Sequence, residues 1–273
     1  MQYMMIFTGI EAIEKDDAAG AGFRRAMEEI EQRLRGTGVW VASERFKPSS
    51  NGAVVILDGE DFRIEKGPFP NPDQIIAGYC VIAVATREDA LTLARQCSEL
   101  VTEYTHGQGR EAVLLVPCME FSEEGESEDG SVAPPRSERT GLRRFIGMFK
   151  PSPETEAGVM PGQEIFTAME NVLCKLADAG RYEKGGGLMP TSAATRVSFA
   201  DGMLVVTDGP FAETKELIAG YAIFRASSLD EVIEMSRPGL EIDARWRRGP
   251  IVSEVRELYP HENAPVLSGR SQP

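Results

Sequence analysis

The sequence predicts an α+β protein built from two similar ferredoxin-like halves, and three observations support this prediction. The chain has 273 residues, which suits two domains of about 100–150 residues each. Two segments recur at an offset of 142 residues: Gly67-Pro68-Phe69 returns as Gly209-Pro210-Phe211, and Ile76-Ala77-Gly78-Tyr79 returns as Ile218-Ala219-Gly220-Tyr221. The hydrophobic pattern recurs at the same offset. We therefore expect a tandem duplication.

The first helix of each half is predicted from apolar residues at helical spacing, i, i+4, i+7 and i+11. Gly38 and Gly180 follow within a few residues, and a glycine in the left-handed conformation commonly ends a helix. We expect both helices to stop there. The apolar positions are Phe23, Met27, Ile30 and Leu34 in the first half and Ile165, Met169, Val172 and Leu176 in the second.

Short strands and a second helix complete each half. The second helices are predicted around residues 90–97 and 232–236, and Pro238 is expected to end the latter. The order strand, helix, three strands, helix, strand favours an antiparallel sheet with both helices on one face, which is the ferredoxin-like arrangement. The predicted strands span residues 3–8, 39–46, 53–57, 75–86 and 112–117, then 144–149, 182–188, 195–199, 203–207, 217–226 and 250–258.

Charge and hydropathy exclude several classes of protein. Acidic residues outnumber basic ones 43 to 29, which gives a net charge of −14 at pH 7. This charge argues against nucleic acid and anionic membranes as partners. No apolar run approaches the roughly 18 residues of a membrane helix, and no signal peptide is recognisable, so we expect a cytoplasmic protein.

The sequence offers no cofactor or metal site. The four cysteines contain no CxxC pair, and the two histidines, His106 and His261, stand in polar, loop-like contexts. A phosphate-binding loop of the form GxxxxGK[ST] is absent. We therefore expect no nucleotide cofactor and no zinc.

Composition divides the chain into four parts. We expect a first repeat at 1–119, an acidic linker at 120–142, a second repeat at 143–260 and a loose tail at 261–273. The linker holds six acidic residues between 120 and 129 and then two prolines. Self-repulsion and proline favour an extended, solvated tether.

A specific motif lies in the second half. It is the run Val206-Thr207-Asp208-Gly209-Pro210-Phe211-Ala212-Glu213-Thr214-Lys215-Glu216, followed by Gly220-Tyr221, with Gly187-Leu188-Met189-Pro190-Thr191 just upstream. This pattern resembles the signature of the YCII-related family, in the branch named for its Asp-Gly-Pro-Phe motif. The first half keeps Gly67-Pro68-Phe69 but begins its motif with Lys66, so its match is degenerate.

The resemblance implies a ferredoxin-like fold whose sheets pair into a dimeric α/β barrel, here formed between the two halves of one chain. Most members of the family have no assigned activity. Some relatives are small-molecule enzymes, including a dehydrochlorinating lyase, for which a His-Asp pair is the proposed centre. Members of this branch often occur beside sigma factors of the extracytoplasmic-function type. The present chain departs from the His-Asp pattern, because neither histidine falls on a predicted strand or motif.

The motif has a structural and a functional interpretation. Asp208-Gly209-Pro210 after a strand is typical of a turn, with Phe211 filling the core. The alternative is a pocket at a barrel mouth, where a carboxylate serves as general base and a lysine holds an anion. In that interpretation the catalytic candidates are Asp208 and Tyr221, and the substrate-binding candidates are Glu213, Lys215, Glu216 and Met189.

Comparison of the two halves favours the structural interpretation. Asp208 corresponds to Lys66 and Lys215 corresponds to Asp73, so both charges invert together. An ion pair tolerates such an exchange, whereas a catalytic base does not. We therefore predict that Asp208–Lys215 and Lys66–Asp73 are equivalent ion pairs of opposite polarity.

Two further segments allow alternative interpretations. Gly185-Gly186-Gly187 would let a ligand or another backbone approach closely, but a bulge or a bend at a strand edge explains it more readily. The cluster Arg245-Trp246-Arg247-Arg248 is interpreted as solvated surface rather than a nucleic-acid site.

Three functions remain open at this stage. The first is a small-molecule pocket in the second half, in a cofactor-independent lyase or isomerase. The second is a non-catalytic module that acts with a protein partner such as a transcription factor. The third is a scaffold that forms homo-oligomers through its strand edges. We favour the first.

Overall fold

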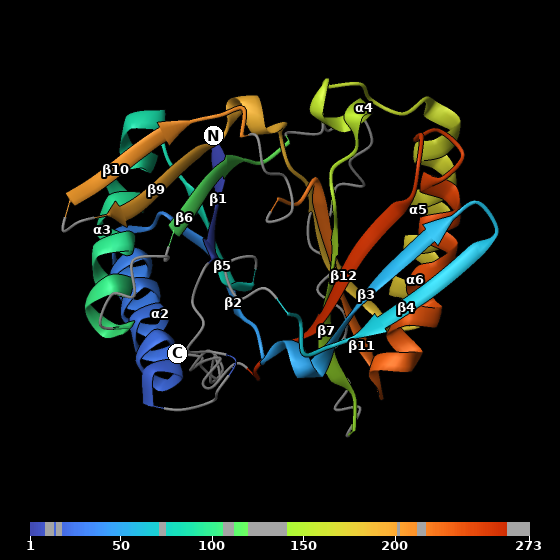
Figure 1. Ribbon diagram of the computed structural model, residues 1–273, viewed down its shortest axis with the longest axis horizontal. Coiled ribbons are helices and arrows are strands. Elements are labelled where there is room, and N and C mark those ends of the chain that lie inside the picture. Colours follow the sequence, from blue (N-terminus) through green and yellow to red (C-terminus); the bar gives the residue numbers. More distant parts are fainter. Residues whose placement is uncertain are drawn as a thin grey trace, which may run out of the picture.

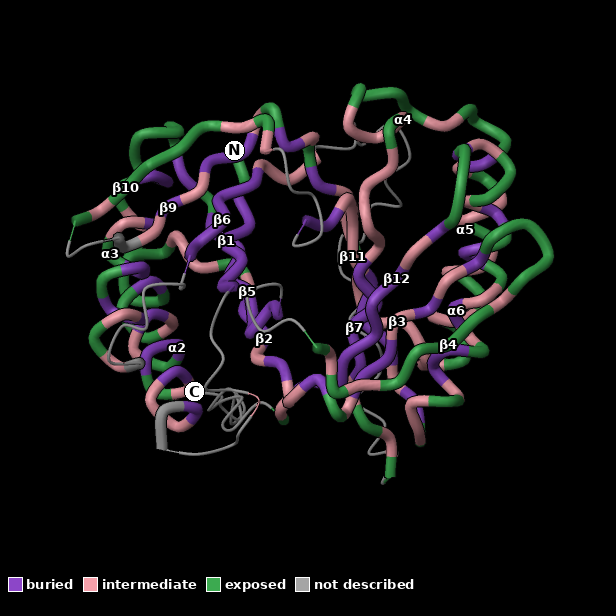
Figure 2. The backbone as a smooth tube through the Cα atoms, in the orientation of Figure 1, coloured by how far each residue is buried: buried purple, intermediate pink, exposed green. Residues whose placement is uncertain are grey.

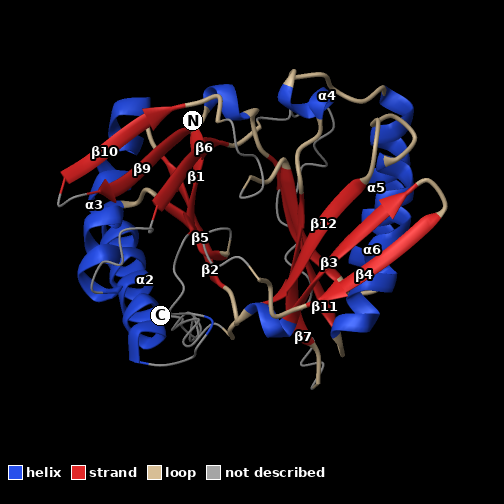
Figure 3. Ribbon diagram, in the orientation of Figure 1, coloured by secondary structure: helices blue, strands red, loops and turns tan. Residues whose placement is uncertain are grey.

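The computed structural model describes residues 1–8, 14, 18–70, 75–105, 112–119, 141–200, 203–211 and 217–260. Within them the chain is mixed α+β, with five α-helices and two six-stranded sheets in which every pair is antiparallel. The sheets face each other and the long helices lie outside them (Figures 1 and 3).

Sheet 1 has the strand order β10-β9-β6-β1-β5-β2. Helices α2 (Ala18–Thr37) and α3 (Arg87–Thr105) cover its outer face, and their apolar sides share one buried cluster with it. Its strands are β1 (Gln2–Thr8), β2 (Trp40–Arg45), β5 (Ile76–Ala83), β6 (Ala112–Pro117), β9 (Thr195–Ala200) and β10 (Met203–Asp208).

Sheet 2 has the order β4-β3-β12-β7-β11-β8. Helices α5 (Gln163–Asp178) and α6 (Leu229–Asp243) cover its outer face, and the single turn α4 (Pro153–Glu156) precedes α5. Its strands are β3 (Gly52–Asp58), β4 (Asp61–Lys66), β7 (Arg143–Phe149), β8 (Tyr182–Gly187), β11 (Gly220–Ala226) and β12 (Ile251–Glu257).

A hairpin from each half belongs to the sheet of the other half. The β3–β4 hairpin pairs with β12, where Gly52 opposes Arg256 and Leu57 opposes Ile251. The β9–β10 hairpin likewise pairs with β6, where Ala112 opposes Ser198. Figure 1 shows the blue β3 beside the red β12. The expectation that each half keeps its strands in one sheet is therefore corrected.

The inner faces of the two sheets enclose a separate apolar cluster, called the central cluster, which appears as the buried centre in Figure 2. Two isolated bridges link the sheet margins, Phe46 to Leu258 and Cys118 to Leu188. Two such layers with helices outside bury one apolar cluster between the sheets and others beneath the helices. The central cluster includes Met4, Ile6, Tyr79, Val81, Leu114, Ile146, Met148 and Ile223.

Several local predictions can be compared directly with the structure. Gly38 and Gly180 have φ of 76° and 68° just after their helices, so the predicted helix ends are confirmed. The prediction for Pro238 is wrong, because this proline lies inside α6. Strand β4 was not among the predicted strands. No helix among the described residues is long and apolar enough to cross a membrane.

Candidate functional site

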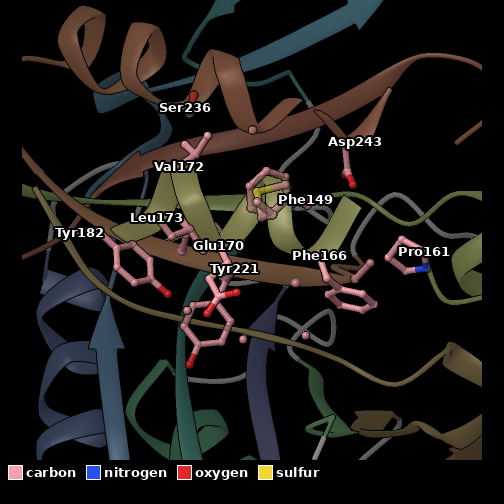
Figure 4. A pocket seen from close by; sticks show the side chains of 18 of the residues that line it. Phe149, Pro161, Phe166, Glu170, Val172, Leu173, Tyr182, Tyr221, Ser236 and Asp243 are labelled. Carbon is pink, nitrogen blue, oxygen red and sulfur yellow. The ribbon is translucent and has the colours of Figure 1, made fainter. Parts of the chain in front are cut away.

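A cavity of about 600 Å³ lies against α5, α6 and strands β8 and β11 of sheet 2. Its wall is mainly apolar and aromatic, and Figure 4 shows the side chains that project into it. The segment between α4 and α5 contributes Val159 and Met160, both about half exposed. Apolar lining residues include Phe149, Phe166, Met169, Leu173, Phe224 and Met235.

The cavity exists because small residues replace larger ones on the elements around it. Gly185, Gly186 and Gly187 of β8 all line it, and the corresponding residues of β2 are Ser43, Glu44 and Arg45. On α6, Gly239 lines the cavity at the position that the buried Cys97 holds on α3.

Helix α5 packs less closely than its counterpart. Ile165 is the only buried residue of this helix. Helix α2, in contrast, buries an apolar stripe on sheet 1, composed of Phe23, Ala26, Met27, Ile30 and Leu34. The second half therefore has a cavity beneath its helix where the first half has a filled core.

Tyr221 is the catalytic candidate that the structure places in the cavity wall. It projects from β11 opposite Gly186, and a Cβ added to that glycine would lie 3.5 Å from the Tyr221 ring. The ring also meets its counterpart Tyr79 across the two sheets, with centroids 5.4 Å apart. Burial raises the pKa of Tyr221 to about 12, so at neutral pH the phenol is a hydrogen-bond donor rather than a base.

Two lining carboxylates are neutralised by arginines. Glu183 lies 2.9 Å from Arg144 and 2.6 Å from Arg225. Asp243 lies 2.6 Å from the Arg247 guanidinium and accepts a hydrogen bond from the Trp246 indole at 3.0 Å. These groups hold β8 and the end of α6 in place.

The basic cluster is therefore not uniformly solvated. Arg247 is buried, pairs with Asp243 and donates a hydrogen bond to the Lys150 carbonyl at 2.6 Å. The interpretation of this segment as surface is corrected for Arg247. In the ranges that the structure describes, no group of three or more His, Cys, Asp or Glu side chains could hold a metal ion.

Asp208 is not among the residues that line the cavity. It ends β10 in sheet 1, with its side chain 66% exposed. Its carboxylate accepts a hydrogen bond from the Thr195 hydroxyl at 2.8 Å and forms an ion pair with Arg87. The Thr195 hydrogen bond and the Arg87 charge lower the pKa of Asp208, which makes it a weaker base.

Of the remaining predicted site residues, the structure describes only Met189. Met189 is 40% exposed and is not among the lining residues. Glu213, Lys215 and Glu216 lie outside the described residues, as does Asp73. The predicted pairs Asp208–Lys215 and Lys66–Asp73 therefore stay predictions.

The ion pairs that the structure does describe at the inverted positions join the two halves. Asp208 pairs with Arg87, the first residue of α3, and Lys66 pairs with Asp230 of α6 at 2.8 Å. Each exchanged hairpin is thus tied to a helix start of the other half.

Sequence reasoning missed the contribution of α5 to the site. Phe166, Glu170 and Leu173 line the cavity, whereas the helical spacing suggested only a core-facing stripe. The signal that could have found the cavity is the Gly185-Gly186-Gly187 run on a strand that faces a helix.

Most of the cavity-lining residues lie in a segment that is similar to known proteins. An uncharacterized protein of Rhizobium meliloti (strain 1021) is 35% identical over 75 residues, which cover 28% of this chain and 60% of that relative. The chain thus spans somewhat less than two thirds of the relative's length. Residues 144–238 match the YCII-related domain, a ferredoxin-like fold. The segment that carries α5, β8, β11 and the first part of α6 is therefore similar to a YCII-related domain.

Proposed function

We propose that this protein binds a small, largely apolar molecule in the cavity beneath α5. The observation that carries the proposal is a cavity of about 600 Å³ next to Gly185–Gly187 in the second half, where the first half has a filled core. That volume lies within the roughly 300–1,000 Å³ of small-molecule sites, and such sites are mainly apolar with a few polar groups. The half with the cavity also contains the YCII-related domain.

Tyr221 is the residue that we assign to the polar end of this molecule. Its hydroxyl stays protonated at neutral pH and can donate a hydrogen bond to a carbonyl or hydroxyl oxygen. If the protein is a cofactor-independent lyase or isomerase, Tyr221 supports the reaction as a proton donor. Asp208 is better suited to anchoring the β9–β10 hairpin, because its partners are Arg87 and Thr195.

A fluorescence titration with the neutral apolar dye N-phenyl-1-naphthylamine tests the proposal. Leu173→Trp adds bulk at a cavity-lining position of α5 and is expected to weaken dye binding severalfold. Lys175→Trp places the same bulk on an exposed, non-lining position of that helix and is the matched control. Equal dye binding by wild type and a folded Leu173→Trp variant would refute the proposal.

We also infer that the chain is a tandem duplication whose two sheets form an intrachain α/β barrel. Strands β2 and β8, the 3₁₀ turns Ser49–Asn51 and Thr191–Ala193, and strands β4 and β10 match at the offset of 142 residues. These correspondences support repeats at 1–119 and 143–260 joined by the acidic linker at 120–142.

A further inference from the structure

One carboxylate that lines the cavity has a counterpart in the first half, and the two differ in whether a cationic side chain pairs with them. Glu170 of α5 lines the cavity, and its counterpart on α2 is Glu28. Each lies the same number of residues before the glycine that ends its helix, Gly180 or Gly38. The two carboxylates therefore occupy equivalent places above the edge strand of their sheet.

In the first half this carboxylate is neutralised from the edge strand. Glu28 forms an ion pair with Arg45 of β2 at 2.7 Å, and the Arg45 side chain is only 15% exposed. Arg45 opposes Gly78 on β5 in the strand register. A partly buried guanidinium thus bridges the helix and the sheet.

In the second half the arginine is replaced by glycine. Gly187 opposes Gly220 on β11, which is the register position that Arg45 holds on β2. Among the residues that the structure describes, no cationic side chain forms an ion pair with Glu170. The second half therefore keeps the glutamate but has a glycine in place of the arginine that would pair with it. Both Glu170 and Gly187 line the cavity.

The other charges around the cavity do not supply this partner. Glu183 has Arg144 and Arg225, and Asp243 has Arg247. Two tyrosine rings also line the cavity, and in Figure 4 Tyr182 and Tyr221 lie on the same side of it as Glu170. A cavity lined by an unpaired carboxylate and by aromatic rings favours a cation, through Coulomb attraction and cation–π interaction.

We propose that the molecule bound in the cavity carries a cationic group, an ammonium or guanidinium on an apolar body, and that this group pairs with Glu170. The ligand cation takes the role that Arg45 has toward Glu28. This inference rests on the proposed function, because it names the chemical class of molecule that the same cavity takes.

Three probes with one apolar body and different end groups test the inference by isothermal titration calorimetry on the full chain at low salt. They are 4-phenylbutylamine, 4-phenylbutan-1-ol and 4-phenylbutanoic acid. We expect the amine to bind most tightly and the acid most weakly. The preference for the amine should shrink as sodium chloride is added, because the carboxylate is exposed at the cavity rim.

Glu170→Gln is expected to weaken amine binding by about 1.4- to fivefold, in line with an exposed ion pair, and to leave alcohol binding unchanged. Gly187→Arg supplies the first half's cation and should also weaken the amine. Glu28→Gln is the matched control and should leave all three affinities unchanged, since Glu28 already has Arg45.

The outcomes separate this inference from the proposed function. Binding of the alcohol with no preference for the amine, or an amine preference that survives in Glu170→Gln, overturns the cation inference alone. Failure of the neutral dye and of all three probes to bind overturns both. A preference for the amine that is lost in Glu170→Gln and kept in Glu28→Gln supports it.

Discussion

At the scale of single residues, Asp208 and Lys66 hold equivalent places with opposite charge. Asp208 pairs with Arg87 and Lys66 with Asp230, so each inverted residue meets an opposite charge at the start of a helix. The sequence comparison anticipated compensated ion pairs. It could not identify these partners, because they lie on the other half and come together only through the exchanged hairpins.

The lowered pKa of Asp208 predicts a pH-dependent contribution to stability. A carboxyl group whose folded pKa lies below its unfolded value stabilises the protein above the unfolded pKa, and this stability is lost as the pH falls through the folded pKa. Wild type should therefore lose more stability than Asp208→Asn between about pH 5 and pH 2. Urea unfolding measured across this range checks the difference, and parallel curves for the two proteins would contradict it.

Substitution by alanine is expected to affect the unfolding free energy differently at two neighbouring glycines of β8. A Cβ at Gly185 would lie 2.6 Å from the Tyr221 carbonyl oxygen and 2.9 Å from the Tyr182 hydroxyl, so Gly185→Ala must displace backbone. It should cost about 1–3 kcal/mol of unfolding free energy. Gly186→Ala meets only the Tyr221 ring at 3.5 Å and should cost much less. Equal losses of unfolding free energy for the two variants, measured by chemical denaturation, would contradict this prediction and show that β8 shifts to accommodate the methyl group at Gly185.

At the scale of elements, α6 is packed loosely where it meets α5. Gly239 faces Met169, and a Cβ there would lie 3.6 Å from the Met169 sulfur, an ordinary contact. Gly239→Ala should therefore stabilise the protein by about 0.5–1 kcal/mol, the usual gain for glycine to alanine in a helix. It should also weaken binding of the apolar dye, because the added methyl group narrows the cavity. Denaturation and dye titration on one variant measure both effects.

Helix α2 supplies the control for this prediction. A Cβ at Gly22 would lie 2.3 Å from the Tyr104 carbonyl oxygen, where α2 crosses α3. Gly22→Ala should be destabilising, although it makes the same change in a helix. If both alanine variants shift stability in the same direction, helix propensity outweighs packing at these sites.

Element prediction from the sequence succeeded where local chemistry decides the outcome. Helical spacing located α2 and α5, and Gly38 and Gly180 end them as expected. Pro238 was misinterpreted because the apolar residues of α6 that follow it, such as Leu240 and Ile242, are buried and extend the helix beyond the proline. The cavity could not be predicted from α5 alone, since its apolar stripe is the same whether the opposing strand carries side chains or glycines.

At the scale of the whole molecule, the exchange of hairpins makes the two halves interdependent. The sequence pattern of β3 and β9 fits either sheet, because their partners β12 and β6 hold equivalent positions, third in the strand order of their sheets. Repeats at a fixed offset therefore predict which strands exist without predicting which sheet they join. The central cluster also combines side chains from both halves, such as Met4 and Met148.

The exchange predicts that residues 1–119 and 141–260 do not form stable monomers when produced separately. Each fragment would expose its inner sheet face, with Ile6 and Tyr79 on one side and Ile146 and Ile223 on the other, and its hairpin would lack its sheet. Exposed apolar faces of this size lead to association. Size-exclusion chromatography and circular dichroism should show self-association of each fragment and a one-to-one complex after mixing. A monomeric fragment that unfolds cooperatively would show instead that one half holds its own hairpin, and that the exchange is not required for folding.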